Sequence, residues 1–534
     1  MINPMRRRRQ AQENTEPLIL AVAHTLSGYD SFYPKAVKIH NREELDGLIR
    51  EIEPGVAALA QSLYPDWAIP IVLQAVGELY YGKYKRYDSC GNYFKRAVAY
   101  LWQDSTIPHG EYKNMDGLTK LVCQCYMLET LYSLRIIFMA IPDFWFSFEN
   151  GYAVIPKVYQ ASFEEFASLA SGKGKRLRIA EVNSELMTGQ MQEFFPALRS
   201  VLDGKPPREI AIFQGTFYEK VPGIENEACA RFWKEVFFRY NLYFFTLTQC
   251  IEGHPPTAVT LFPEFAVVGT EKYLTQEIVT NSFWTSKWFK KQSPERYGNL
   301  LVDKPIVRIS PDGDFATSPV LIGDSLNQFV EKQLLRYSTR DPYLSMPDHI
   351  FKDAFSEEFE NQCIELFRKR GYLAGHVSEK GIWKHQTGSV DLNFSAEKLY
   401  GEIDVLACHT QWPISILVEC KVLLDAQDSK SYQNMVSKLR DDSEGFRNKL
   451  RKKAAWISGS FRSRFHFPVE PLMVLATDIP MPVLQADDSD IHLTYFSNLE
   501  AILDTIGAHF PEVDKEVPLQ IKSLWKEFID PAAS

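Results

Sequence analysis

The chain has 534 residues, of which 45% are hydrophobic and 24% are charged. This composition excludes a disordered, collagenous or coiled-coil protein, and at roughly 100–200 residues per domain the length predicts about three domains. With 59 Lys and Arg residues against 68 Asp and Glu residues, the formal net charge is −9, so any binding of nucleic acid requires a local basic patch.

The first 16 residues are polar and basic. A run of four arginines, Arg6–Arg9, leads into a polar segment and not into the apolar core of a signal sequence. We therefore expect residues 1–16 to form a disordered basic tail, in preference to an arm that grips phosphates.

Residues 17–150 are predicted to form a helical domain. Asn41 is a good N-cap residue and Glu44 follows three positions later, which is a capping-box pattern. The segments Ile69–Tyr81 and Leu118–Met139 are long and apolar, as expected for the buried helices of a bundle.

Two features indicate a soluble, cytoplasmic protein. The most apolar stretch, Tyr132–Phe148, is interrupted by Arg135, Pro142 and Asp143, so we expect no membrane span. The 8 cysteines form no C-x-x-C pair and several lie in apolar runs, which is typical of buried free thiols in a reducing compartment.

Residues 151–345 are predicted to be a mixed α+β region. Helices are indicated at Phe163–Ala170 and Asn226–Ile251, and strands at Ala258–Val268 and Leu300–Ile309. No nucleotide-binding fingerprint, helicase motif or internal repeat emerges before residue 345, so this part of the sequence does not indicate a function.

The pattern changes near Arg340–Asp348, where two prolines indicate a domain boundary. Residues 346–534 then alternate between helix and strand patterns, which predicts an α/β domain whose central sheet is covered on both faces. The expected elements are, in order, a helix at Glu357–Arg370, strands at Tyr400–Ala407 and Ile414–Lys421, a long basic helix at Ser431–Ser458, strands at Leu472–Thr477 and Ile491–Phe496, and a helix at Asn498–Ile506.

A short turn-like segment joins the strand candidates Tyr400–Ala407 and Ile414–Lys421, which predicts an antiparallel hairpin. Folding the chain back at position 411 or 412 places Asp404 opposite Glu419. Because side chains alternate along a strand, Glu419 and Lys421 share a face. The sequence therefore predicts that two acids and a lysine converge on one side of the hairpin.

Charged side chains at the end of an apolar strand are costly to bury unless they pair with one another or bind a metal. Carboxylate oxygens suit Mg²⁺ or Mn²⁺, so Asp404 and Glu419 are candidate metal ligands. Lys421 is then placed to orient or deprotonate an attacking water and to offset the charge that develops on phosphorus. The alternative is a structural ion pair between Glu419 and Lys421 on two exposed strands.

Asp404 followed by Glu419-x-Lys421, at the ends of a hairpin, resembles the motif of the PD-(D/E)xK nucleases. Ile403 stands where the name of the motif has proline, a departure that this superfamily commonly shows. The resemblance covers about residues 350–510. It implies a restriction-endonuclease-like fold for the C-terminal domain.

The resemblance also implies a further metal ligand, because the first helix of these folds often supplies an acid to the site. Glu360 is the candidate for this role, with Glu357 and Glu358 as nearby rivals. The superfamily acts mainly on DNA, so the resemblance implies DNA as the substrate. By family association alone, it suggests prokaryotic defence against foreign DNA as the role.

A local basic patch follows the motif. Between Lys438 and Arg464 there are nine basic residues and three acidic ones. We expect Lys449, Lys452 and Lys453 to bind the phosphates that flank the scissile bond. The alternative is a solvated helix face.

The sequence thus predicts a multidomain protein, with an α-helical and mixed N-terminal region followed by a C-terminal α/β restriction-endonuclease-like domain. The expected activity is a Mg²⁺-dependent endonuclease. Expected partners are nucleic acid, and either a second copy of the chain or separate proteins that bind the N-terminal region. Two alternatives remain open: a scaffold or binding protein with a vestigial nuclease-like domain, and an RNA-cleaving nuclease.

Overall fold

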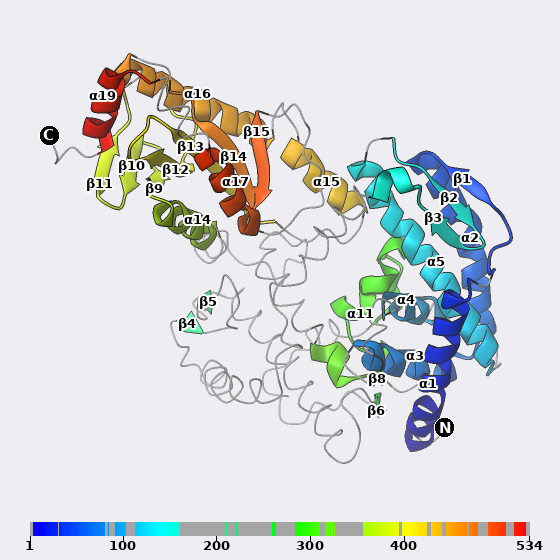
Figure 1. Cartoon of the computed structure of the whole chain (residues 1–534). Coiled ribbons are helices and arrows are strands. Elements are labelled where there is room, and N and C mark those ends of the chain that lie inside the picture. The colour runs from blue at the N-terminus through cyan, green and yellow to red at the C-terminus, as the bar shows by residue number, and fades with distance from the viewer. Residues whose placement is uncertain are drawn as a thin grey trace.

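Figure 1 shows a computed structural model of the chain, in which helices predominate towards the N-terminus and a large sheet lies towards the C-terminus. The structure describes residues 4–29, 31–80, 84, 91–102, 113–141, 143–160, 209–210, 221–222, 259–262, 284–309, 315–323, 325, 356–394, 398–423, 429–440, 445–466, 469–478, 490–508 and 517–529. The expected helices at Phe163–Ala170 and Asn226–Ile251 and the boundary at Arg340–Asp348 lie outside the described residues.

The N-terminal region is helical, as predicted. Its long helices share one hydrophobic core, and they are α1 (Pro4–Ser27), α2 (Arg42–Ser62), α3 (Pro65–Tyr80), α4 (Gly91–Leu101) and α5 (Met115–Ala140). Asn41 caps the start of α2 as predicted, but the reciprocal bond of the capping box goes to the His40 amide and not to that of Asn41. The Asn41 side chain accepts a hydrogen bond from the Glu44 amide at 2.9 Å, and the Glu44 carboxylate accepts one from the His40 amide at 2.8 Å.

Helix α1 replaces the disordered tail that was predicted for residues 1–16, so that prediction is wrong for residues 4–16. Ala11 and Thr15 are buried on one side of the helix. Because the residues around them are polar, the sequence shows no apolar periodicity that would predict this buried face. Arg7 is also held, by an ion pair with Asp66 at 3.0 Å.

Helix α5 is the helix among the described residues that is long and apolar enough to cross a membrane. More than half of its most apolar window is buried inside the protein, where Leu121, Val122 and Leu128 join the core of the helical region. A core helix of a soluble protein has these properties, so the structure is compatible with the predicted solubility.

Short elements accompany these helices. Strands β1 (Val37–Ile39), β2 (Phe146–Glu149) and β3 (Tyr152–Val154) form one small antiparallel sheet, and strands β6, β8 and β7 form another. The remaining short elements are η2 (Lys157–Tyr159), β4 (Glu209–Ile210), β5 (Val221–Pro222), β6 (Thr260–Phe262), α10 (Ser286–Phe289), η5 (Pro294–Asn299), α11 (Leu300–Asp303), β7 (Val307–Arg308) and β8 (Phe315–Thr317).

The described part of residues 151–345 contains short helices and strands. The strand expected at Ala258–Val268 is observed as β6, whereas the segment Leu300–Ile309 begins as the helix α11 and becomes a strand only at β7. Trp284, Leu300 and Ala316 belong to the same core as α1–α5, so these segments pack onto the helical region.

The C-terminal region is built on a mixed sheet of seven strands (Figure 1). The strand order is β11-β10-β9-β12-β13-β14-β15; the last three strands are parallel, and the other neighbours are antiparallel. The strands are β9 (Tyr372–Val377), β10 (Ile382–His385), β11 (Gly388–Asp391), β12 (Ile403–His409), β13 (Ser415–Lys421), β14 (Leu472–Thr477) and β15 (Ile491–Tyr495).

Helices cover both faces of this sheet, as predicted for the α/β domain. Alternate residues of β12 face opposite sides: Val405 and Ala407 pack in one core, while Leu406 and Cys408 pack in the other. The first core includes helices α14 (Glu357–Lys369) and α17 (Phe496–Ala508), and the second includes α15 (Ser429–Arg440), α16 (Phe446–Phe465) and α19 (Leu519–Ile529).

Candidate active site

The hairpin of β12 and β13 has the register that the sequence predicts. Val405 lies opposite Val418 and Leu406 opposite Leu417, so the next position outward places Asp404 opposite Glu419. The turn between the strands is closed by a backbone hydrogen bond of 2.9 Å from the His409 amide.

The three predicted side chains converge. Glu419 and Lys421 share the face of β13 that carries Leu417, on the side of the sheet that α16 covers. The Lys421 ammonium nitrogen lies 2.7 Å from Glu419 Oε1 and 3.5 Å from Asp404 Oδ2. The predicted cluster is therefore present, and its lysine pairs with both acids.

The backbone of Cys420 completes the arrangement around Lys421. Its amide donates a hydrogen bond of 2.8 Å to Asp404 Oδ2, and its carbonyl oxygen accepts one of 3.0 Å from Lys421 Nζ. Three oxygen atoms, from Asp404, Glu419 and the Cys420 carbonyl, thus surround one ammonium group.

Lys453 of α16 is a fourth member that the sequence analysis had assigned to phosphate binding. Its ammonium nitrogen lies 2.5 Å from Glu419 Oε2 and 4.0 Å from Asp404 Oδ1, and the residue is buried. The sequence does contain a signal that Lys453 is buried, because Lys453 lies at the helical spacing set by the apolar residues Leu450 and Ile457. We refer to Asp404, Glu419, Lys421 and Lys453 as the four-residue cluster.

Burial and pairing affect the two carboxyl groups in opposite directions. Burial raises the pKa of Asp404, and the negative charge of Glu419 raises it further, which outweighs the effect of the two lysines and the Cys420 amide. Burial alone would also raise the pKa of Glu419. The ammonium groups of Lys421 and Lys453 outweigh this effect and hold the pKa of Glu419 below its usual value.

Lys421 remains protonated in this arrangement. Burial would lower its pKa, but the carboxylates of Asp404 and Glu419 more than compensate, so the pKa of Lys421 lies above its usual value. The ring of Phe446 lies beside the ammonium group, with 5.2 Å between Lys421 Nζ and the ring centroid.

Glu360 lies on α14, which packs on the other face of the sheet from α16. Its Oε2 atom is 3.4 Å from His376 Nδ1. Its charge also acts on the buried thiol of Cys420 and helps to raise the pKa of that group, after burial and the contact with Cys363. Of the two rival acids, Glu357 is exposed, and the side chain of Glu358 lies outside the described residues.

Lys449 and Lys452, the other predicted phosphate-binding residues, are exposed on α16. Lys452 extends over the ring of Tyr400, with 4.6 Å between its ammonium nitrogen and the ring centroid. These two side chains remain accessible to a ligand, whereas Lys453 is buried in the four-residue cluster.

The donor atoms of the cluster fit a hard divalent cation. Two carboxylates and a carbonyl oxygen are a donor set that Mg²⁺ accepts, with waters and substrate phosphates completing its coordination. In the structure these oxygens surround the Lys421 ammonium group instead. Among the described residues, no group of three or more His, Cys, Asp or Glu side chains lies in a position to hold a metal ion.

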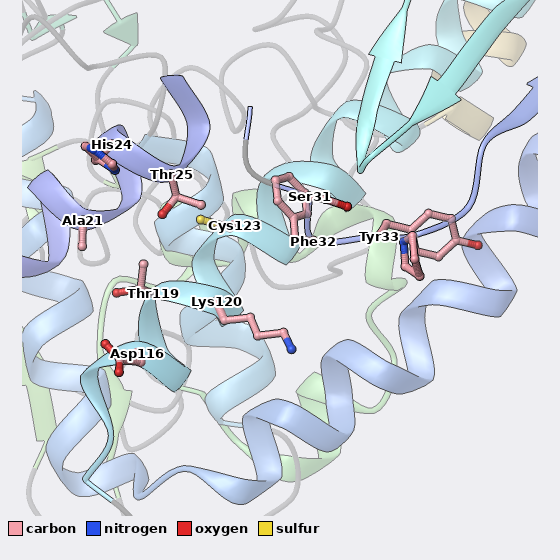
Figure 2. A pocket seen from close by; sticks show the side chains of 11 residues that line it. Ala21, His24, Thr25, Ser31, Phe32, Tyr33, Asp116, Thr119, Lys120 and Cys123 are labelled. Atoms are coloured by element: carbon pink, nitrogen blue, oxygen red, sulfur yellow. The ribbon is translucent and has the colours of Figure 1, made fainter. Parts of the chain in front are cut away.

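A separate pocket of about 690 Å³ lies in the helical region. Figure 2 shows its walls, which come from α1, from the segment 31–34 and from α5. Its ionisable side chains are those of His24, Tyr33, Asp116, Lys120 and Cys123. This mixture of charges does not indicate a particular ligand class.

Comparisons of the chain with protein-family models, with curated proteins and with solved structures find no match.

Proposed function

We propose that the C-terminal domain is a metal-dependent phosphodiester hydrolase that cleaves nucleic acid. The observation that supports this proposal is the convergence of Asp404, Glu419 and Lys421 on adjacent strands. Asp404, Glu419 and the Cys420 carbonyl would hold Mg²⁺, or Mn²⁺ in its place.

In this proposal, each side chain has a distinct role. When bound, the metal supplies a Lewis acid that activates water and stabilises the charge on phosphorus. A lysine is protonated at neutral pH even at its ordinary pKa, so we assign Lys421 to orienting the water and donating to the phosphate rather than to removing a proton. Lys453 holds one oxygen of Glu419 and leaves the other for the metal.

We further propose DNA as the substrate and prokaryotic defence as the role, which follow from the resemblance to the PD-(D/E)xK nucleases. The resemblance alone names Glu360 as a further metal ligand, whereas in the structure Glu360 lies on α14, across the sheet from the face that carries Glu419 and Lys421. The basic helix α16 supports nucleic acid as the partner, and the buried free thiols fit a cytoplasmic location. Partners of the N-terminal region, whether a second copy of the chain or another protein, are part of the same proposal.

One observation favours the alternative of a scaffold with a vestigial nuclease-like domain. Two acids and two lysines already neutralise one another in the cluster, so it is also complete as a buried ion-pair network. In the nuclease proposal, a metal ion takes the position of the Lys421 ammonium group among these oxygens. In the scaffold proposal, Lys421 stays in that position.

Cleavage assays distinguish these proposals. The full-length protein is incubated with Mg²⁺ and, separately, with plasmid, duplex DNA, single-stranded DNA and RNA. We expect cleavage that is abolished by chelation of the metal and by Asp404→Ala or Lys421→Ala, while the exposed-site control Lys430→Ala cleaves as the unaltered protein does. Cleavage of RNA alone would support the RNA-cleaving alternative.

Two results would contradict the nuclease proposal. Equal cleavage by the unaltered protein, Asp404→Ala and Lys421→Ala would place the activity outside this cluster or in a contaminant. Failure to cleave any substrate with either metal ion would support the scaffold.

A further inference from the structure

An exposed aromatic side chain lies beside the four-residue cluster. Tyr400 is 57% exposed, although large hydrophobic residues in the C-terminal region are mostly buried. It precedes β12 by a short turn, in which Gly401 has a positive φ of 86° that favours glycine. Four residues further along the chain is Asp404, so the ring is anchored close to the cluster.

The ring is also linked to the cluster through α16. Lys452 places its ammonium group 4.6 Å from the Tyr400 centroid, and the next residue, Lys453, contacts Glu419. Tyr400 is thus four residues from Asp404 in the chain, and Lys452 is the neighbour of Lys453. The backbone therefore holds both members of the Tyr400–Lys452 pair near the cluster. A cation beside an aromatic ring favours binding of a nucleic-acid strand, because the ring can stack on a base while the cation binds a neighbouring phosphate.

The helix that carries Lys452 supplies further positive charge. The sequence of α16 contains seven basic residues and no acidic residue, in a chain whose net charge is −9. Its exposed basic side chains are Lys449, Lys452, Arg462 and Arg464. At the far end of the helix, Arg464 extends over Phe394 at 5.5 Å, but that ring is partly buried against the core. Basic side chains beside an exposed aromatic ring are typical of surfaces that bind single strands.

We propose that the Tyr400–Lys452 pair binds one unpaired base of a nucleic-acid strand, with the base stacked on the tyrosine ring and a flanking phosphate on the lysine. In duplex DNA, both faces of each base are covered by its neighbours, so a fixed ring can stack only on a base that is single-stranded or has been extruded. This inference rests on the proposed function, and it specifies the substrate as a strand with unpaired bases next to the cluster.

Binding measurements without metal test this inference separately from cleavage. Full-length protein carrying Asp404→Asn is titrated, in the presence of a chelator, into a fluorescein-labelled single-stranded oligonucleotide and into its duplex. Tyr400→Ala should weaken binding of the single strand by about tenfold, the size typical for loss of one stacked base, and change duplex binding by less than twofold. Tyr400→Phe keeps the ring and should bind within about twofold of its parent, as should the control Lys430→Ala.

A 2-aminopurine base in the oligonucleotide reports stacking directly. We expect its fluorescence to be quenched by the parent protein and by Tyr400→Phe, but not by Tyr400→Ala. A merely structural role for Tyr400 would weaken single-strand and duplex binding equally and leave the quenching unchanged, which would overturn the proposal. Equal binding of the single strand by all variants would also overturn it.

The two proposals can fail independently. If cleavage is observed but Tyr400→Ala retains quenching and affinity, the stacking site is wrong and the nuclease stands. If no substrate is cleaved but Tyr400→Ala loses single-strand binding, the binding site stands without the activity.

Discussion

The ammonium group of Lys421 lies among the three oxygens that a divalent cation would use. It is 2.7 Å from Glu419 Oε1, 3.0 Å from the Cys420 carbonyl and 3.5 Å from Asp404 Oδ2. Two cations cannot occupy this position together, so a metal ion would bind only after Lys421 leaves. The ring of Phe446, 5.2 Å away, lies next to the ammonium group and could retain its cation–π contact as the side chain moves.

Lys421→Met should therefore increase the affinity for Mn²⁺, by about tenfold or more, because it removes both the competing cation and its repulsion. Isothermal titration or the electron paramagnetic resonance signal of free Mn²⁺ measures this affinity without reference to activity. Lys453→Met is the matched control, since it removes an equal charge that lies beside the other oxygen of each acid, 2.5 Å from Glu419 Oε2 and 4.0 Å from Asp404 Oδ1. Equal gains from both variants would show that Lys421 acts by repulsion alone and does not occupy the metal position.

The opposite pKa shifts of the two acids predict opposite effects on stability. The raised pKa of Asp404 means that its ionised form is disfavoured in the folded protein, so Asp404→Asn should raise the midpoint of thermal unfolding at pH 7. The lowered pKa of Glu419 means that its ionised form is favoured, and Glu419→Gln leaves the partly exposed Lys421 and the buried Lys453 short of a partner. We expect this second variant to lose about 3 kcal/mol or more.

The pH dependence follows from the same shifts. Asp404 has a raised folded pKa, so its contribution is most favourable at low pH and is lost as the pH rises through that pKa. The advantage of Asp404→Asn should thus disappear in acid. Ionised Glu419 stabilises the folded protein at pH values above the pKa that this group has in the unfolded chain. This stabilisation is lost as the pH falls through its lower pKa in the folded protein. Chemical denaturation of the three proteins between pH 4 and 8 measures both trends, and a destabilised Asp404→Asn at pH 7 would contradict the first.

Sequence reasoning located three of the four cluster residues because their positions depend on local rules. Alternation along a strand and the length of one turn are sufficient to place Asp404 opposite Glu419. Lys453 joins them only because α16 packs across the sheet, and a single sequence does not specify that packing. The sequence therefore predicts a phosphate-binding role for Lys453, although its spacing along the helix matches that of its buried neighbours.

At the scale of elements, helix α15 is held at its first residue by the helical region. Glu295 of η5 accepts hydrogen bonds from the Ser429 amide at 2.6 Å and from the Ser429 hydroxyl at 3.0 Å. The backbone of Glu295 is fixed in turn by the fully buried Arg96, which donates to its carbonyl at 2.9 Å. Because α15 begins eight residues after Lys421, this contact connects the helical core to the strand that carries the cluster.

Glu295→Ala should loosen the first turn of α15, because a carboxylate at a helix N-terminus satisfies free amides and interacts favourably with the helix dipole. We expect faster hydrogen–deuterium exchange across residues 429–432 and a loss of about 1 kcal/mol of stability. Ser429→Ala keeps the amide contact and should show a smaller effect. Glu13→Ala, at an exposed position on α1, is the control. Unchanged exchange in α15 would show that Glu295 does not cap this helix.

The elements with strong local signals were predicted, and those that depend on neighbours were not. Strand β14 was predicted at its observed bounds, and α14 ends at Lys369, two residues before Gly371, whose φ of 83° favours the end of a helix. The strands β9, β10 and β11 were not predicted; two of them have only four residues each and lack a clear apolar alternation. The single helix expected at Ser431–Ser458 is observed as α15 and α16, with residues 441–444 between them outside the described residues.

At the scale of the whole molecule, the two large cores are in contact at α5 and α15. Ile136 and Met139 of α5 pack against the core formed by the sheet, α15, α16 and α19. Near this contact Arg42 donates a hydrogen bond of 3.3 Å to Gln433 of α15, and Figure 1 shows one end of α5 beside α15. The N-terminal region is thus joined to the C-terminal domain through α15, the helix that follows β13, a connection that neither region's own sequence pattern indicates.

The charge of the whole molecule limits how it can bind a polyanion. The chain has a net charge of −9, while α16 alone carries seven basic residues and no acidic one. Beyond a Debye length of about 8 Å at physiological salt, the acidic remainder is screened, so the local helix determines binding. Affinity should therefore come from a few phosphate contacts rather than from a broad basic surface.

Four exposed basic residues on α16 predict a shallow salt dependence. At about 0.7 per phosphate for a single strand, a plot of log affinity against log salt concentration should have a slope between about −2 and −3. Lys449→Gln should reduce the steepness by about 0.7, whereas Lys430→Gln, on α15, should leave it unchanged. Anisotropy titrations of the metal-free protein between 50 and about 200 mM salt measure these slopes. A slope steeper than about −6 would require many more phosphate contacts than α16 provides, and the binding surface would then lie elsewhere on the molecule.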